Sequence, residues 1–192
     1  VYDGILPFHV EHIALDDASR PKTKIMMNVG TPDEAFALAS LPCDGVGLAR
    51  EEFIITTYVK VHPQALLDYD NLEPATQREI DQVAGSYRDK PQFYIDRLSE
   101  GIAMIAAAFH PKDVILRLSD FKSNEYANLI GGARFEPHEE NPMIGFRGAS
   151  RYYAPSFQAA FGLECRAIQR VRQDMGLRNL KLMIPFCRTV EE

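Results

Sequence analysis

Short apolar runs alternate with helix-start signals along most of the chain. The run Lys24–Gly30 ends at a glycine, and Thr31–Glu34 follows it with a capping residue, a proline and an acid in the order typical of a helix start. Three further apolar runs of strand length are Gly45–Arg50, Asp113–Asp120 and Lys181–Arg188. The pattern therefore predicts four β-strands, each followed by helical sequence.

The segments between these strands carry helical spacing. Glu51–His110 is predicted to hold several helical segments, with a capping box at Thr76–Glu79. The clearest helix begins at Ser156 and is expected to end at Gly176. Two sets of apolar residues recur at helical spacing and are expected to face the core: Phe93, Leu98, Ile102, Ile105 and Phe109, then Phe157, Ala160, Phe161, Ile168, Val171 and Met175.

Strands that alternate with helices predict an α/β protein with a parallel sheet and right-handed crossovers. A capping-box pattern at Thr189–Glu192 predicts one more helix beyond the fourth strand. Four βα units make either the N-terminal half of a (β/α)8 TIM barrel or most of a doubly wound sheet. We therefore expect a truncated piece of a longer polypeptide, whose open strand edges pair between copies or pack against missing segments.

Two stretches stand outside this alternation. Residues 1–23 have an apolar start and end near Pro21, and they are predicted to be a linker or the last strand of an upstream unit. Lys122–Arg151 is rich in Gly, Pro and Asn and is longer than an ordinary connection, which predicts a functional loop.

Composition narrows the class of protein. The 192 residues are 46% hydrophobic, enough for one core, and 21 Lys and Arg against 27 Asp and Glu leave a net charge of −6. That balance excludes a broad cationic surface for nucleic acid or anionic lipid. The longest apolar run, Ile102–Phe109, is far shorter than the ~20 residues of a membrane span, and no signal-peptide pattern is present, so we expect a soluble cytoplasmic protein.

The chain has an odd number of cysteines, without a CxxC pair or zinc-ligand spacing. This pattern argues against a disulfide framework and against a structural metal. Cys43, Cys165 and Cys187 are expected to be small buried residues.

Arginines stand where a parallel sheet binds its ligands. Arg50, Arg117 and Arg188 lie at or near the carboxyl ends of predicted strands. An arginine among apolar neighbours is costly to bury unless it meets a carboxylate or an anion, so a salt bridge to a neighbouring strand and anion binding both stay open. If Arg50 and Arg117 point into the same mouth of the sheet, anion binding is favoured over separate salt bridges, because a guanidinium binds a carboxylate or phosphate through two parallel hydrogen bonds. Arg147, beside Gly148, is a further candidate anion contact because glycine permits close approach.

Other chemistry is weakly indicated. Glu136–Glu140, which includes His138, is either a set of metal ligands or a solvated acidic turn, and we favour the turn. His62 and His110 each precede a proline and predict turns, and together with His9 and His12 they form no triad or metal pattern. The chain has no phosphate-binding loop of the GxxxxGK[ST] type and no GxGxxG fingerprint.

Five motifs in order along the chain carry a resemblance. They are Met26–Gly30, Asp44–Phe53, Arg117–Tyr126, Glu140–Gly148 and Met183–Thr189. Together they closely resemble the phosphoenolpyruvate synthase family, in the C-terminal barrel that it shares with pyruvate phosphate dikinase and enzyme I of the sugar phosphotransferase system. The resemblance assigns residues 1–23 to the end of a preceding phosphohistidine domain and its linker, and 24–192 to the first four βα units of the barrel that binds phosphoenolpyruvate and pyruvate.

The resemblance implies a magnesium-dependent conversion of ATP, pyruvate and water to AMP, phosphoenolpyruvate and phosphate. In such enzymes a histidine on a swivelling domain carries the phosphoryl group to the barrel, and the full-length protein is expected to be a homodimer. By position, Arg50 and Arg117 look like the arginines that hold the phosphoryl group and pyruvate, and Arg147 looks like a further contact in the same mouth.

The rest of the family's machinery is expected outside this chain. The magnesium ligands and the cysteine that protonates the enolate lie on later strands, ATP binds to another domain, and neither His9 nor His12 sits in the carrier motif. We therefore expect no catalytic or metal-binding residue in this chain, and no activity from it alone. Two alternatives stay open: an enzyme like pyruvate phosphate dikinase, which uses phosphate as co-substrate, and a non-catalytic module that binds phosphoenolpyruvate or a partner.

Overall fold

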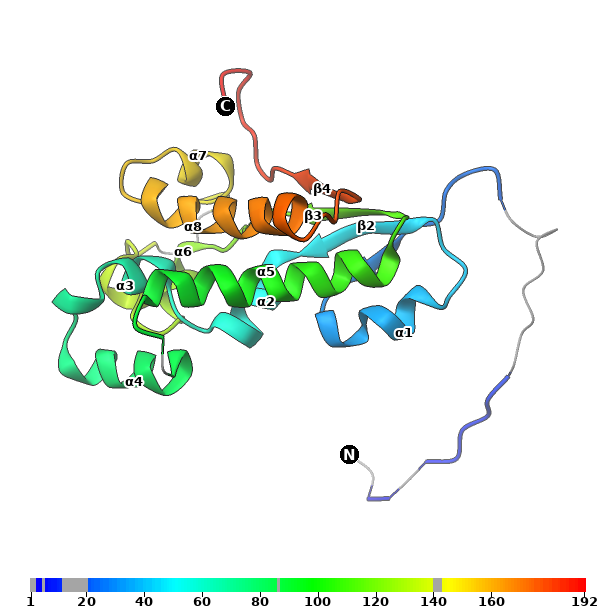
Figure 1. The fold of residues 1–192 in the computed structure, drawn as a ribbon, viewed down its shortest axis with the longest axis horizontal. Helices are drawn as coiled ribbons and strands as arrows, with labels where there is room; N and C mark the ends of the chain where they lie inside the picture. The colour runs from blue at the N-terminus through cyan, green and yellow to red at the C-terminus, as the bar shows by residue number, and fades with distance from the viewer. Residues whose placement is uncertain (1–2, 5, 12–20, 86, 140–142) are drawn as a thin grey trace.

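The computed structural model describes residues 3–4, 6–11, 21–85, 87–139 and 143–192. A four-stranded parallel sheet runs through the molecule in the order β1-β2-β3-β4 (Figure 1). The strands are β1 (Met27–Val29), β2 (Gly45–Arg50), β3 (Asp113–Arg117) and β4 (Leu180–Met183). The predicted α/β class and the four parallel strands are confirmed, with β2 at its predicted bounds.

The strands end where side chains take over the backbone hydrogen bonds. β3 stops at Arg117 instead of Asp120, because the N–H groups of Ser119 and Asp120 donate to the carboxylates of Glu164 and Glu52. β4 stops at Met183, short of the predicted end at Arg188, and Pro185 lies beyond it, as suits a proline near the end of a strand.

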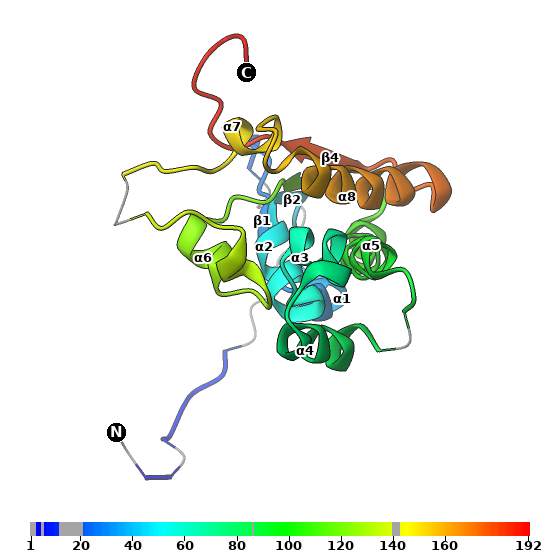
Figure 2. The same ribbon diagram turned by 90° about the vertical axis from the view of Figure 1, so that its left-hand side faces the viewer.

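Helices cover the sheet. In chain order they are α1 (Ala35–Ala39), α2 (Glu51–Ile54), α3 (Pro63–Leu67), α4 (Pro74–Ala84), α5 (Lys90–Phe109), α6 (Ser123–Ala127), α7 (Ala149–Tyr152) and α8 (Gln158–Gln169). Short 3-10 turns lie at Pro32–Glu34, Tyr69–Asn71 and Gly132–Arg134, and π-helical turns at Ile55–Val59 and Arg170–Asp174. The 20-residue α5 packs against α1, α8 and β3 (Figure 2).

The apolar faces that the sequence predicts largely form the core. All five predicted core residues of α5 are buried, at 2% exposure or less. On α8 and its π-helical extension the predicted face is buried at Phe157, Ala160, Ile168 and Val171, but Met175 is 39% exposed because the helix has already ended there. Burial of such side chains stabilises the fold by roughly 1.5–3 kcal/mol each.

Two local predictions differ in detail from the structure. The capping box at Thr76–Glu79 does not start a helix, because α4 begins at Pro74 with Glu73 as its N-cap, which leaves Thr76 inside the first turn. Lys122–Arg151, predicted as one long functional loop, is more regular than expected, since its described residues include α6, a 3-10 turn and the first residues of α7.

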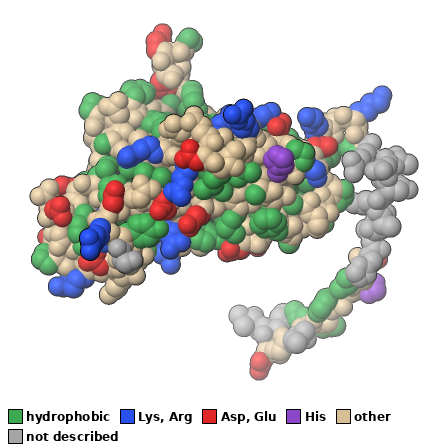
Figure 3. All heavy atoms as spheres, viewed as in Figure 1, with side chains coloured by type: hydrophobic (Ala, Val, Ile, Leu, Met, Phe, Trp, Pro, Cys, Tyr) green, Lys and Arg blue, Asp and Glu red, His purple; other side chains and the backbone are tan. Residues whose placement is uncertain are grey.

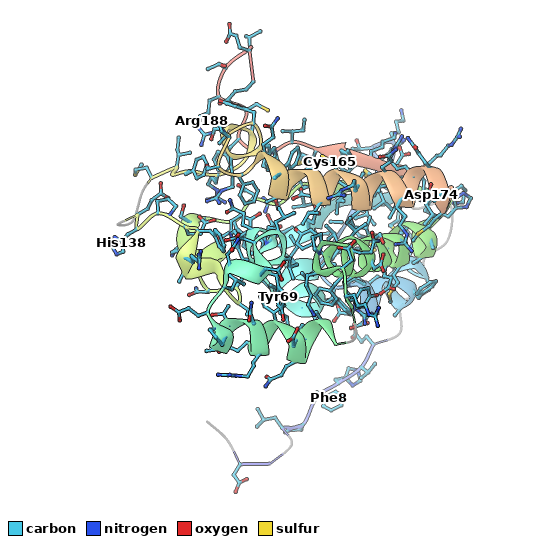
Figure 4. All side chains as sticks on the ribbon, turned by 60° about the vertical axis from the view of Figure 1, so that its left-hand side comes forward. Phe8, Tyr69, His138, Cys165, Asp174 and Arg188 are labelled. Carbon is cyan, nitrogen blue, oxygen red and sulfur yellow. The ribbon has the colours of Figure 1, made fainter. Side chains whose placement is uncertain are left out.

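The cysteines do not lie in the core. Cys165 and Cys187 are exposed and Cys43 is half-buried, so the expectation of buried cysteines is wrong. Cys165 falls on the outer face of α8, one residue beyond the buried Glu164 (Figure 4).

Two surface properties bear on the class of protein. None of the described helices is long and apolar enough to cross a membrane. On the described face seen in Figure 3, basic side chains are interspersed with acidic ones. Of the N-terminal segment, residues 1–2, 5 and 12–20, with His12, lie outside the described residues.

Candidate functional site

The three predicted arginines line one cavity at the carboxyl end of the sheet. Arg50 is the last residue of β2, Arg117 is the last residue of β3, and the two are register partners on neighbouring strands. Arg147 reaches the same cavity from the segment before α7. The cavity measures about 790 Å3, within the ~300–1,000 Å3 typical of small-molecule sites.

Acidic side chains fix two of the three arginines. Arg117 Nη2 donates to Glu52 Oε1 at 2.9 Å, and its Nη1 lies 3.6 Å from Asp120 Oδ2. Arg147 donates to both carboxylate oxygens of Asp120, from Nε at 2.7 Å and from Nη2 at 2.9 Å. The salt bridges that the sequence allowed as an alternative to anion binding are therefore present. The paired side chains form part of the lining of the cavity.

Arg50 differs from Arg117, its register partner, in having no acidic side chain paired with it among the described residues. Its side chain is exposed, its guanidinium carbon lies 5.4 Å from the centroid of the Phe53 ring, and it makes no ion pair within the described part of the chain. Since Arg117 stands directly across from it, an anion bound between the two would reduce their mutual repulsion.

The cavity is locally basic in an acidic chain. Four basic side chains line it, Arg50, Lys60, Arg117 and Arg147, against three acidic ones, Glu52, Asp120 and Glu125. Hydrogen bonds from the guanidinium to Asp120 raise the pKa of Arg147 further above its usual range, so this residue stays charged.

A buried carboxylate anchors the turn between Arg117 and Asp120. Glu164, on the inner face of α8, accepts from Ser119 N at 3.0 Å and from Ser119 Oγ at 2.7 Å. Tyr126 donates to the same hydroxyl at 3.0 Å, and Tyr152 donates to Ser119 O at 2.6 Å. Side chains from three helices, α6, α7 and α8, thus hold Ser119, which lies in the chain between Arg117 and Asp120.

Glu51, next to Arg50, is a second buried carboxyl close to this anchor. Burial raises its pKa well above the usual range, and the charge of Glu164 adds to the effect. Burial likewise raises the pKa of Glu164, although Ser119 opposes the shift. Burial and the neighbouring carboxyl of Glu164 thus both favour the protonated form of Glu51.

A second polar cluster ties down the segment that carries Arg147. Arg151, 1% exposed, donates to the two carboxylate oxygens of Glu136 at 2.6 and 2.7 Å and to Phe146 O at 3.0 Å. His62, fully buried at the N-cap of α3, accepts from Gln64 N through Nδ1 and therefore donates from Nε2 to Glu136 Oε1 at 3.0 Å. Burial lowers the pKa of His62, which keeps it neutral.

Comparison with known proteins shows the family of the chain. Residues 9–192 match the PEP-binding domain of the PEP-utilising enzymes, where PEP is phosphoenolpyruvate. The chain belongs to this family.

Among similar proteins, the phosphoenolpyruvate synthase of Synechocystis is 58% identical over 194 residues, which cover all of this chain and 24% of that protein. The phosphoenolpyruvate synthases of Escherichia coli (56% over 192 residues) and Aquifex aeolicus (50% over 238 residues) also match the whole chain, over 24% and 28% of their own lengths. The chain thus spans about a quarter of the length of these curated relatives.

Some of the residues that line the cavity could have been found from sequence and others could not. Glu52 and Asp120 stand two and three residues after Arg50 and Arg117, so their spacing offered a signal. Lys60 offered none, because the chain brings it back to the cavity through the turn after α2.

The acidic segment before Arg147 is only in part the solvated turn that the sequence predicts. His138 is exposed and points away from the body of the molecule (Figure 4), but the Glu136 side chain is 1% exposed and paired, so the prediction is wrong for Glu136. Glu140 lies outside the described residues. Arg188, predicted at the end of the fourth strand, lies five residues beyond the end of β4 and does not line the cavity, so its predicted position is wrong.

The described residues do not fit a magnesium site. No group of three or more His, Cys, Asp or Glu side chains among them could hold a metal ion. Most of the acidic groups in the cavity are engaged: Asp120 by Arg147, Glu52 Oε1 by Arg117 and the backbone, and Glu125 Oε2 by the N–H of Lys122. Glu52 Oε2 is buried without a hydrogen-bond partner in the described structure, and one such oxygen does not make a set of metal ligands.

Proposed function

We propose that this cavity binds pyruvate and phosphoenolpyruvate, and that the protein to which the chain belongs is a pyruvate, water dikinase. Such an enzyme converts ATP, pyruvate and water to AMP, phosphoenolpyruvate and phosphate through a phosphohistidine. The observation that carries the proposal is the register pairing of Arg50 and Arg117 on one cavity, with Arg147 beside them.

The chemistry of the ligand suits this cation arrangement. Phosphoenolpyruvate carries a carboxylate and a phosphate, and a guanidinium binds either group through two parallel hydrogen bonds. Phosphoryl transfer needs alignment and positive charge at the oxygens of the transferred group more than covalent help from the protein. Arg50, Arg117 and Arg147 can supply both.

Magnesium would stabilise the enolate oxygen of pyruvate, which is strongly disfavoured without a positive partner. The described residues offer no set of ligands for it, so we place those ligands, the acid that protonates the enolate and the ATP site in other parts of the protein.

The strand order supports half of a TIM barrel over a doubly wound sheet. A doubly wound sheet reverses its strand order at a switch point, whereas β1 to β4 follow one another without reversal. We propose that 24–192 form the first four βα units of a (β/α)8 barrel, with 1–23 as the linker to a phosphohistidine domain, in a cytoplasmic homodimer.

The product formed by the full-length protein tests the function. With ATP, pyruvate and magnesium we expect AMP and phosphoenolpyruvate in equal amounts without added phosphate. A strict requirement for added phosphate would instead indicate a pyruvate phosphate dikinase. Binding of phosphoenolpyruvate without any AMP formation would favour the non-catalytic module.

A further inference from the structure

Arg188, five residues after the end of β4, connects the chain there to the segment that carries Arg147. Its Nη2 donates to Gly145 O at 3.1 Å and to Arg147 O at 3.2 Å, and its Nη1 donates to Ser150 Oγ at 2.8 Å. One guanidinium thus contacts the backbone on both sides of Phe146 and the first turn of α7. Figure 4 shows Arg188 beside this helix.

The residues just before Arg188 pack on the same segment. The Phe186 ring centroid lies 4.6 Å from the guanidinium carbon of Arg147, and Ala149 N donates to Pro185 O at 3.0 Å. A Cβ on Gly148 would lie 2.5 Å from Pro185 O, so the two backbones touch at a position that only glycine fits. Phe186 itself has φ +52°, a conformation that is costly for an aromatic residue.

The Arg147 segment needs such support. Arg147 lies outside any helix or strand, and Gly145 and Gly148, with φ +78° and +65°, flank it closely on both sides. Glycines give this stretch of backbone more freedom than any other residue would. Asp120 holds the far end of the Arg147 side chain, whereas the carbonyl oxygen of Arg147 accepts hydrogen bonds from Arg188 Nη2 and from Ser150 Oγ, each at 3.2 Å. Ser150 Oγ itself accepts from Arg188 Nη1, so Arg188 supports this carbonyl directly and through Ser150.

We propose that Arg188 is a positioning residue that holds Arg147 in the anion cavity, an inference that rests on the proposed function. Arg188 does not line the cavity, so it acts on the ligand only through the segment it holds. The planar guanidinium is needed because its donors serve three acceptors at once, whereas a lysine presents one point charge.

A double-mutant cycle in the full-length protein tests the coupling, with calorimetric titration of phosphoenolpyruvate as the measurement. Arg188→Ala is expected to weaken binding about tenfold, and Arg188→Lys to weaken it less. Because Arg188 acts through Arg147, adding Arg188→Ala to Arg147→Ala should cause no further loss. Arg178→Ala removes the same charge at an exposed position before β4 and should leave affinity unchanged.

Limited proteolysis separates this inference from the proposed function. Trypsin cleavage between Arg147 and Gly148, followed by mass spectrometry, should be faster in Arg188→Ala than in the wild type or Arg178→Ala. Equal cleavage rates, or binding losses that add in the double variant, would overturn the positioning role. If the wild type fails to bind phosphoenolpyruvate, the proposed function is wrong, and the cleavage rates alone decide whether Arg188 holds the segment.

Discussion

Arg50 and Arg117 are register partners at the last paired position of the parallel strands β2 and β3, and both line the same cavity. Two like charges at directly paired positions are unfavourable in a sheet. Glu52 offsets the charge of Arg117 at 2.9 Å, while Arg50 makes no ion pair in the described part of the chain. A bound dianion could pair with Arg50 and also contact Arg117, so this arrangement of charges favours an anionic ligand.

Replacing Arg117 by lysine should separate binding from folding. The lysine keeps the positive charge beside Glu52 but loses the second donor, so we expect the KM for pyruvate to rise about tenfold or more with little change in thermal stability. Steady-state kinetics and thermal unfolding of the full-length protein check this. Unchanged kinetics would remove Arg117 from the site.

The buried His62 should make the fold sensitive to mild acid. Burial lowers its pKa below the ordinary 6.5, so the unfolded chain takes up a proton more readily than the folded chain. Stability is therefore expected to fall as the pH drops from about 6.5 toward the lowered folded value. Urea unfolding at a series of pH values measures the slope.

The matched variant for this test is His62→Asn. Asparagine can still accept the N–H of Gln64 as an N-cap, but it does not titrate. The variant should be less stable than the wild type near pH 8, because Glu136 loses a hydrogen bond, and it should lose the slope just below pH 6.5. An identical slope in both proteins would show that another group is responsible.

Glu164→Ala should destabilise the turn that holds Arg117 and Asp120. The substitution leaves two buried donors of Ser119 without this acceptor, and each such loss costs about 1–3 kcal/mol. Denaturant unfolding should show a loss in that range or above it. Cys165→Ala, at the exposed neighbouring position of α8, is the control and should change stability little; equal effects of the two substitutions would contradict the anchor.

The 192-residue chain alone should not turn over substrate. It spans about a quarter of the length of its phosphoenolpyruvate synthase relatives, and the described residues contain no metal-ligand cluster. An assay of this polypeptide with ATP, pyruvate and magnesium should yield no AMP above background. Turnover would show that the chain contains catalytic groups assigned here to other parts of the protein.

Local patterns predicted the elements that depend on local forces. The bounds of β2 and the buried face of α5 follow from apolar spacing, and strand-end position was enough to bring Arg50 and Arg117 together. Predictions failed where residues far apart in the sequence determine whether a side chain is buried. Glu136 looks like a solvated acid in sequence, yet it is buried because His62, 74 positions away, and Arg151 converge on it.

The supporting contacts of the site were equally hidden. Glu164 lies among apolar residues on α8, and only the fold shows that it serves Ser119, 45 positions earlier. The sequence predicts a strand-end position for Arg188 like those of Arg50 and Arg117, but β4 ends at Met183 and the donors of Arg188 are used by Gly145, Arg147 and Ser150. A predicted strand-end position therefore points to candidate ligand contacts, and the actual end of the strand and the surrounding acceptors decide which of them line the cavity.

The most direct test of the account is the affinity of the full-length protein for phosphoenolpyruvate, measured by calorimetry in the wild type, Arg50→Gln, Arg117→Gln and the double variant. If the paired arginines share the anion, each single substitution should weaken binding at least about tenfold, and the double loss should depart from the sum of the single losses. Affinities equal to that of the wild type in both single variants would contradict the account.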